Sequence, residues 1–256
     1  MIKLEHTVLP SPEQMAFVIE GMRNPMNSWD KSDSGYHCAH YCKEICSIEC
    51  TGDDDFCPQN AEYRLGDNDH TLMLKLAKAG TDHRKYLRMM PVYVRITAPL
   101  YWWKEFDTYK IATVANSCST MHKIHAKKFV LDDFSNEHLD LDNYDLLKQI
   151  MVRLNHYRDI YINGGMIEYP DCGRQTFEPK SKKIWRQMIQ LLPSSYNQTR
   201  NAMLNYEVLA NIYASRQGHK LDEWGEFCKW IKTLPYSDLI LTAAGVTEGE
   251  NNNDIT

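Results

Sequence analysis

The sequence has no long hydrophobic run. No apolar stretch in its 256 residues approaches the roughly 20 residues that a membrane-spanning helix needs. The first residues, MIKLEHTVLPSPEQ, lack the basic start and the apolar core of a secretory signal peptide. We therefore expect a cytoplasmic protein without a membrane partner.

The chain also lacks an excess of positive charge. It has 29 lysines and arginines against 34 aspartates and glutamates, which gives a formal net charge of -5. A protein that binds nucleic acid through its phosphates normally carries a surplus of basic side chains. We expect no nucleic-acid partner, although a small anionic molecule needs only a local group of cations.

Several common catalytic motifs are missing as well. The sequence has no Gly-x-x-x-x-Gly-Lys loop, no His-Glu-x-x-His, no Gly-x-Ser-x-Gly and no Gly-x-Gly-x-x-Gly. Any functional assignment therefore depends on residues outside these patterns.

Eight cysteines are present, and most of them lie in a cysteine-rich insert at about residues 35–60. Four of these recur every four residues: Cys38, Cys42, Cys46 and Cys50. On a helix this spacing gives one stripe rather than the tetrahedral set that zinc needs, so we expect reduced thiols and no metal. A partial metal site that adds Cys57, His37 or His40 is the alternative.

Capping and periodicity predict the first elements. Ser11 and Gln14 form a capping box, which predicts a helix over residues 12–23. A second helix is expected from residue 67 to Gly80. Alternating apolar and polar residues predict a strand over residues 91–97.

Further helices are expected over residues 146–163, 181–192, 200–216 and 221–234. Residues 131–142 and 166–180 are predicted to be surface loops, and residues 245–256 a disordered tail. Together these elements predict a helix-rich protein with a single domain over residues 1–244. If residues 200–216 form one helix, Asn205 and Arg216 lie eleven residues apart and share a face.

Residues 99–122 concentrate the side chains that can do chemistry. Trp102, Phe106 and Tyr109 recur at helical spacing, so one face of a helix should be core. Residues 116–120 are predicted to form a polar loop beside it, a common place for ligand contacts. Cys118 in this loop is either a nucleophile or a packing and ligand-contact residue.

Donors from other segments could join this loop in one site. His83, Lys110, Ser119 and Arg216 would together suit a phosphate or a pyrimidine. The alternative is that Arg216 is only a cation near a helix C-terminus.

The order of residues in the central segment is typical of one enzyme family. Thr97-Ala98-Pro99 leads from the predicted strand into the helix, Thr108-Tyr109-Lys110 follows, and then Cys118. This resembles the flavin-dependent thymidylate synthases, which have an Ala-Pro helix entry, an Arg-His-Arg motif and a later serine. A shift of one residue would instead match Asn116-Ser117-Cys118-Ser119 to the family's Asn-x-x-Ser, and both registers stay open.

The C-terminal half resembles the same family. Leu192-Pro193 is followed by Asn205, Leu209, Asn211 and finally Arg216, at the spacing of the family's C-terminal block, which ends in an arginine that contacts the pyrimidine.

Two positions nearer the N-terminus also match. His83 stands at the family's flavin-side histidine, and Ser28 resembles a flavin-contacting serine.

The chain departs from the family at charged positions. Lys110 is the single cation left in the central motif, Ile189 and Thr120 replace arginines, and Glu105 replaces a phosphate-side glutamine. Losing guanidinium groups and gaining a carboxylate should weaken the binding of a nucleotide monophosphate.

The resemblance implies an α/β (α+β) fold, a single helix-rich domain with a small central β-sheet. It implies an FAD-dependent methyltransferase that converts deoxyuridylate to thymidylate, with NADPH and methylenetetrahydrofolate as co-substrates. It also implies a homotetramer with sites shared between subunits, and Arg216 as the catalytic group that polarises or orients the pyrimidine. The implied cofactor contacts are Ser28, His83, Thr108, Tyr109, Lys110, Asn205 and Asn211. The implied substrate contacts are Glu105, Cys118, Ser119, Thr120 and Arg216.

Two other interpretations stay open. One is a related enzyme that modifies another pyrimidine nucleotide, for example by hydroxymethylation. The other is a non-catalytic protein that binds a nucleotide or a flavin, which the missing cations favour.

Overall fold

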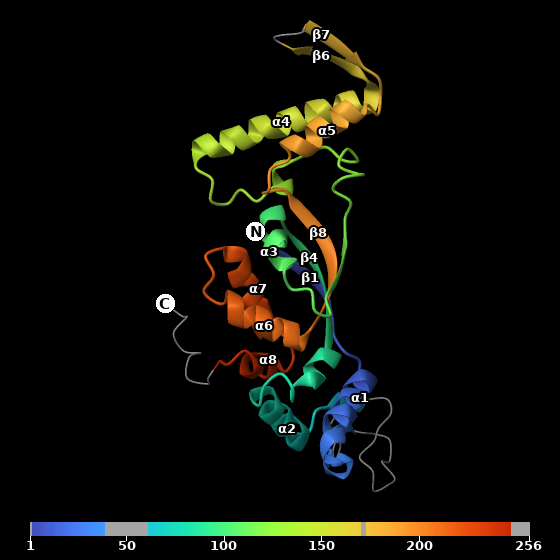
Figure 1. Ribbon diagram of the computed structural model, residues 1–256, viewed down its shortest axis with the longest axis vertical. Helices are drawn as coiled ribbons and strands as arrows, with labels where there is room; N and C mark the ends of the chain where they lie inside the picture. Colours follow the sequence, from blue (N-terminus) through green and yellow to red (C-terminus); the bar gives the residue numbers. More distant parts are fainter. Residues whose placement is uncertain (1, 39–60, 170–172, 247–256) are drawn as a thin grey trace, which may run out of the picture.

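The computed structural model describes residues 2–38, 61–169 and 173–246. It is elongated, with a β-sheet in the middle and helical lobes at both ends (Figure 1). Four strands build the central sheet: β1 (Lys3–Val8), β4 (Pro91–Pro99), β8 (Asn197–Asn205) and β5 (Val114–Ser117). They are all antiparallel and lie in the order β1-β4-β8-β5.

The two faces of this sheet differ. Along β4 the side chains of Val92, Val94 and Ile96 are buried, whereas Tyr93 and Arg95 between them are exposed. The buried face packs on helices, and among the described residues Figure 1 shows no helix over the opposite face. We call the face that carries Tyr93 and Arg95 the open face.

The helices on the buried face are α3 (Leu100–Phe106), α6 (Tyr206–Arg216), α7 (Asp222–Lys232) and α8 (Ser237–Ala243). Aromatic rings fill the space between α3 and α7. Trp102 is fully buried, and its ring centroid lies 5.0 Å from that of Phe106 and 4.7 Å from that of Trp224. This cluster fixes α3 against α7 and so sets the position of the polar residues at the end of α3.

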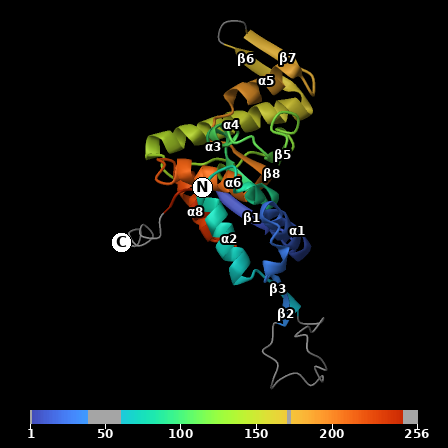
Figure 2. The same ribbon diagram turned by 60° about the horizontal axis from the view of Figure 1, so that its bottom comes forward.

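The N-terminal lobe contains α1 (Pro12–Arg23), α2 (Asp67–Lys78) and the hairpin of β2 (Gly35–Cys38) and β3 (Ala61–Arg64), which projects beyond the two helices in Figure 2. Short 3-10 turns at Asn24–Met26 and Trp29–Lys31 follow α1, and another at Lys85–Met89 precedes β4. The Asp33 carboxylate accepts hydrogen bonds from the backbone N–H groups of Asn68 (2.9 Å) and Asp69 (3.1 Å), so it caps α2. Gly66 permits this approach, because a Cβ there would lie 2.5 Å from the backbone of Asp33.

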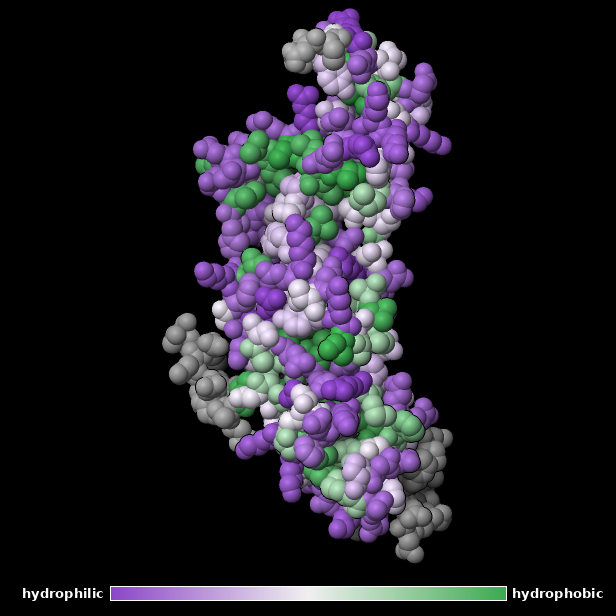
Figure 3. Space-filling view, viewed as in Figure 1, coloured by the Kyte–Doolittle hydropathy of each residue, from purple (hydrophilic) through white to green (hydrophobic). Residues whose placement is uncertain are grey.

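The other end is an arm with its own small cores. It contains α4 (Leu141–Asn163), α5 (Lys182–Leu191) and the hairpin of β6 (Gly165–Tyr169) and β7 (Gly173–Phe177), and a 3-10 turn at Leu131–Asp133 precedes it. Leu147, Leu154 and Met188 are buried between α4 and α5. In Figure 3, hydrophobic side chains also gather on the surface of this end, over α4 and α5.

Most predicted helices are confirmed. The helix over residues 12–23 has both capping-box bonds, from the Gln14 N–H to Ser11 Oγ (3.3 Å) and from the Ser11 N–H to Gln14 Oε1 (2.9 Å). The predicted helix-rich fold with a small central sheet is also confirmed.

Three local predictions are wrong. Residues 166–180 are not a loop but contain the β6–β7 hairpin. Residues 114–117 form β5, so the predicted loop at 116–120 begins within a strand. Residues 131–142 are only partly a surface loop, because Asp133 and Phe134 are buried.

The predicted helix over residues 200–216 is wrong in its first part. All of β8 pairs with β4, and this pairing outweighs the weak local preference of the sequence NQTRNAMLN for a helix. Helix α6 begins only at Tyr206. Asn205 is therefore the N-cap of α6 and does not share a helix face with Arg216.

Parts of the cysteine-rich insert and the tail lie outside the described residues. Cys38 ends strand β2, so a helical cysteine stripe cannot begin there. Cys42, Cys46, Cys50, Cys57 and residues 247–256 belong to the segments that are not described. Within the described part, no helix is long and apolar enough to cross a bilayer.

Candidate functional site

Arg216 is the centre of a polar cluster between α3 and α6. Its Nε donates to the Tyr109 hydroxyl (2.9 Å) and its Nη1 donates to Glu105 Oε2 (2.8 Å). The guanidinium also lies 4.7 Å from the ring centroid of Trp224 and 5.6 Å from that of Tyr109. Two aromatic rings and two hydrogen bonds therefore fix its orientation.

Glu105 is the carboxylate of this cluster. Besides Arg216, its Oε2 accepts a hydrogen bond from Trp224 Nε1 (2.8 Å) and lies 3.6 Å from His219 Nε2. His219 Nδ1 accepts from the Leu221 N–H at 3.1 Å, and His219 Nε2 lies 3.2 Å from Arg216 Nη1. We call these residues, Glu105, Tyr109, Arg216, His219 and Trp224, the Arg216 cluster.

Three predicted site residues are thus brought together: Glu105, Tyr109 and Arg216. Arg216 is therefore more than a cation at the end of a helix. Its side chain is only 17% exposed, and it hydrogen-bonds Glu105, which lies more than 100 positions away in the sequence.

A second arginine, which the sequence did not single out, lies beside the same C-terminal end of α3. Arg200 on β8 donates to Asp107 Oδ1 (2.7 Å) and to Gln198 Oε1 (2.9 Å), and its guanidinium lies 4.1 Å from the Trp103 ring centroid. A basic residue in a strand carries no motif of its own, so only the pairing of β4 and β8 reveals its position. Each of these two arginines is already paired with a carboxylate from the α3 region.

The predicted substrate loop is anchored to β8 beside Arg200. The Gln198 amide donates to the Cys118 carbonyl (3.1 Å) and to Thr120 Oγ1 (2.6 Å). Ser119 Oγ accepts from the His122 N–H (3.0 Å). Cys118 is exposed, and neither His122 nor any other described side chain hydrogen-bonds its thiol. No described side chain is therefore placed to act as the base that a Cys118 nucleophile would need.

The connection after α3 carries Thr108 and Lys110. The Thr108 hydroxyl donates to the Glu105 carbonyl (2.7 Å), and Lys110 is exposed without an ion pair to any described residue. Ala112 has a φ of +55°, which is unfavourable for a residue with a Cβ. The loop that carries Lys110 is therefore strained as well as exposed.

Ser28 lies in a different part of the molecule, beneath α1. Arg23 Nη1 donates to the Ser28 carbonyl (3.1 Å), and Arg23 Nε donates to Asp69 Oδ1 (2.5 Å). The hydroxyls of Ser32 (2.7 Å) and Ser34 (2.6 Å) both donate to Asp69 Oδ2. This buried network fixes the segment from Ser28 to Ser34.

The network has a direct electrostatic consequence. Burial alone would raise the pKa of Asp69, but the Ser34 and Ser32 hydroxyls and the Arg23 guanidinium outweigh it and hold this pKa below its usual range. The pKa of Tyr63 is raised, first by burial and then by the negative charge of Asp69.

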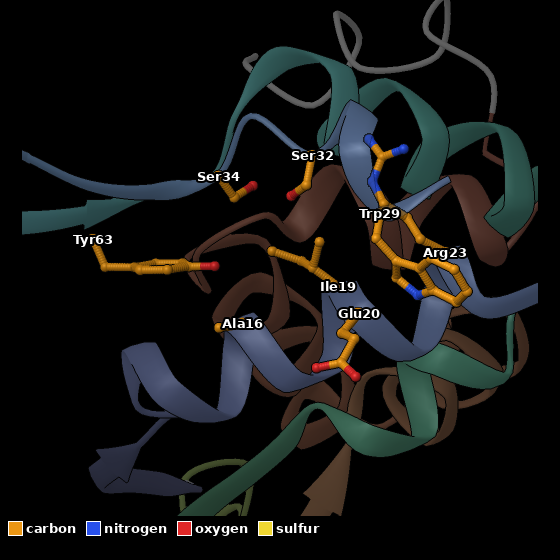
Figure 4. A pocket seen from close by; sticks show the side chains of 8 residues that line it. All are labelled: Ala16, Ile19, Glu20, Arg23, Trp29, Ser32, Ser34 and Tyr63. Atoms are coloured by element: carbon orange, nitrogen blue, oxygen red, sulfur yellow. The ribbon is translucent and has the colours of Figure 1, made fainter. Parts of the chain in front are cut away.

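A cavity of about 130 Å³ opens beside this network (Figure 4). Figure 4 shows Tyr63 and Trp29 on opposite sides, with Ile19 between them and the serine hydroxyls above. An engineered cavity of roughly this size holds a benzene molecule, so this one has room for a single ring.

The remaining predicted residues are dispersed. His83 is exposed in the turn after α2. Asn205 is buried, and its side-chain oxygen caps α6 by accepting from the Val208 N–H (2.9 Å). Asn211 is exposed on α6. The part of the chain that the structure describes contains no group of three or more His, Cys, Asp or Glu residues placed to hold a metal ion.

No family model and no curated protein matches the sequence. Solved structures are similar in fold. The flavin-dependent thymidylate synthase ThyX from Helicobacter pylori, solved with FAD and dUMP, superposes with a TM-score of 0.56 at 14% identity, over 95% of this chain and 98% of that one. The UMP/dUMP methylase PolB from Streptomyces cacaoi, bound with 5-Br dUMP, gives a TM-score of 0.51 at 12% identity, over 96% and 95% of the two chains. The chain therefore has the fold of the flavin-dependent thymidylate synthases, the family that its sequence motifs resemble.

Proposed function

We propose that the protein modifies the C5 position of a pyrimidine deoxynucleotide with the help of a flavin, and that the reaction is the methylation of deoxyuridylate to thymidylate. The observation that carries this proposal is the Arg216 cluster. Tyr109 from the central motif and Arg216 from the C-terminal block are far apart in sequence, yet they hydrogen-bond to each other at 2.9 Å. The likeness in fold along nearly the whole chain supports the same assignment.

Arg216 would contact the pyrimidine ring. Its guanidinium is held between Tyr109 and Trp224, so it is oriented before any ligand arrives, and orientation of this kind lowers the entropy lost on binding. The loop at Cys118, Ser119 and Thr120 would meet the phosphate, and Arg200 is held beside it through Gln198, which hydrogen-bonds both the loop and Arg200.

The flavin contacts would come from Tyr109, Lys110 and His83. Lys110 and His83 are exposed and form no ion pair with a described residue, so their donors suit the diphosphate of FAD. Ser28 fits less well, because its carbonyl and hydroxyl both accept hydrogen bonds from Arg23. When bound and reduced by NADPH, the flavin would supply the hydride, and methylenetetrahydrofolate the carbon unit.

We also propose a homotetramer. The open face exposes Val8, Tyr93 and Val114 in one cross-strand row, and α4 exposes Leu141 and Val152. Apolar residues of this size on a sheet face and a helix suit subunit contacts.

The closed ion pairs favour a second candidate. Glu105 neutralises Arg216 and Asp107 neutralises Arg200, so neither arginine offers an unpaired charge to a phosphate. This arrangement suits a non-catalytic protein that only binds its ligand, or an enzyme that acts on a different pyrimidine.

Genetic complementation separates these candidates. We expect the wild-type chain to rescue a thymidine auxotroph and Arg216→Ala to fail, with both proteins present at equal levels. The purified wild type should also retain FAD, visible as flavin absorption bands. Rescue by Arg216→Ala, or a colourless protein that binds no added FAD, would contradict the proposal.

A further inference from the structure

Glu105 uses only one of its two carboxylate oxygens. Oε2 accepts from Arg216 Nη1 and from Trp224 Nε1, both at 2.8 Å, whereas no described residue hydrogen-bonds Oε1. The Glu105 side chain is 35% exposed. The Arg216 cluster therefore presents a free acceptor at the surface.

Arg216 has a corresponding free donor. Its Nε donates to Tyr109, and its Nη1 contacts Glu105 and His219, but no residue in the described ranges accepts a hydrogen bond from Nη2. The two aromatic rings beside the guanidinium prevent it from turning freely. A donor and an acceptor thus belong to one rigid ion pair.

The charges of this pair cancel. A phosphate gains little from a guanidinium whose charge is already balanced by a carboxylate, and the free oxygen of Glu105 repels it. A ring edge that carries a carbonyl next to an N–H group is complementary, because the carbonyl accepts from Nη2 and the N–H donates to Oε1. Uracil has such an edge at O4 and N3.

We propose that Glu105 is the residue that makes the Arg216 cluster specific for the N3–H edge of an uncharged pyrimidine ring. This inference rests on the proposed function, since it names the edge of the pyrimidine ring that the same site would recognise. It also explains why a carboxylate stands where a phosphate-side amide would be expected.

Titration calorimetry on the full chain with added FAD tests the proposal, with deoxyuridine and N3-methyldeoxyuridine as probes. The wild type should bind deoxyuridine about tenfold more tightly or better, the effect expected when an acceptor loses its donor. Equal affinities in the wild type would overturn the proposal whether or not any variant folds.

The variant Glu105→Gln separates hydrogen bonding from steric exclusion of the methyl group. If the amide oxygen keeps the bonds to Arg216 and Trp224, its NH2 replaces the free acceptor with a donor. The preference for deoxyuridine should then fall to less than about threefold, because only the unmethylated ring loses a bond. A tenfold preference that persists in Glu105→Gln would show that the methyl group merely clashes, and would overturn the proposal.

Asp107→Asn is the matched control. It removes a carboxylate that lies two residues further along and pairs with Arg200 rather than Arg216, so the wild-type preference should remain. Loss of the preference in this variant as well would mean that net charge controls binding, against the proposal. Failure of the wild type to bind any uracil nucleoside or deoxyuridylate, with FAD bound, would instead refute the proposed function and this inference with it.

Discussion

Asp69→Asn is expected to lower the free energy of unfolding by weakening the hydrogen bonds that hold the segment from Ser28 to Ser34. Asp69 is fully buried and accepts hydrogen bonds from Arg23, Ser32 and Ser34, so its charge balances that of the buried Arg23. Removing one partner of a buried ion pair typically costs about 3–5 kcal/mol, since the other charge is left uncompensated. We expect a loss of about 3 kcal/mol, near the lower limit, because Arg23 keeps its bonds to the carbonyls of Ser28 (3.1 Å) and Lys31 (3.0 Å).

Urea unfolding followed by circular dichroism measures this loss, and thermal melting should show a decrease of about 6–12 °C in the midpoint. Asp67→Asn is the control, because Asp67 is exposed on the first turn of the same helix and should contribute less than about 1 kcal/mol. A loss below about 1 kcal/mol in Asp69→Asn would refute the account of this network.

The contribution of Asp69 also has a defined pH dependence. Because its pKa is lowered in the folded protein, the stabilisation is fully present above the unfolded-state value of about 3.9. It is lost as the pH falls through the lower folded-state pKa. The difference in unfolding free energy between wild type and Asp69→Asn should therefore shrink below about pH 4.

Three further substitutions test other parts of the fold. Ala112→Gly should stabilise the protein by about 0.5–1 kcal/mol, since it relieves the positive φ, and urea unfolding would reveal it; no gain would contradict the strain assigned to this loop. Asn205→Ala should cost about 1 kcal/mol by removing the cap of α6, whereas Asn205→Asp should retain the cap; equal losses would argue against capping. Trp102→Ala should cost about 3–5 kcal/mol because it opens a cavity between α3 and α7, and a loss near zero would contradict the packing described.

Local signals in the sequence were sufficient for several elements. The capping box at Ser11 and Gln14 gave the first helix its correct bounds, because both bonds are made within one turn. The alternation of Val92, Val94 and Ile96 with exposed residues likewise identified β4, since one face of the sheet is covered and the other is not. In both cases the information lies within a few residues.

Other features depend on partners that are distant in sequence. Strand β8 was missed because its residues have little preference of their own, and its hydrogen-bonded neighbours are the sequence-distant strands β4 and β5. For the Arg216 cluster, the sequence predicted Glu105, Tyr109 and Arg216 as individual site residues, but not the contacts between them. Sequence spacing gave no sign that Glu105 would pair with Arg216, from which it is separated by 111 positions. Arg200 had no signal at all outside the sheet register.

Tritium release from deoxyuridylate labelled at C5 tests the central claim most directly, because replacing the C5 hydrogen with a carbon unit must free the label. With FAD, NADPH and methylenetetrahydrofolate present, we predict release by the wild type and none by Arg216→Ala. The same assay with C5-labelled deoxycytidylate separates the second pyrimidine. Absence of release from both nucleotides by the wild type, with FAD shown to be bound, would contradict the account.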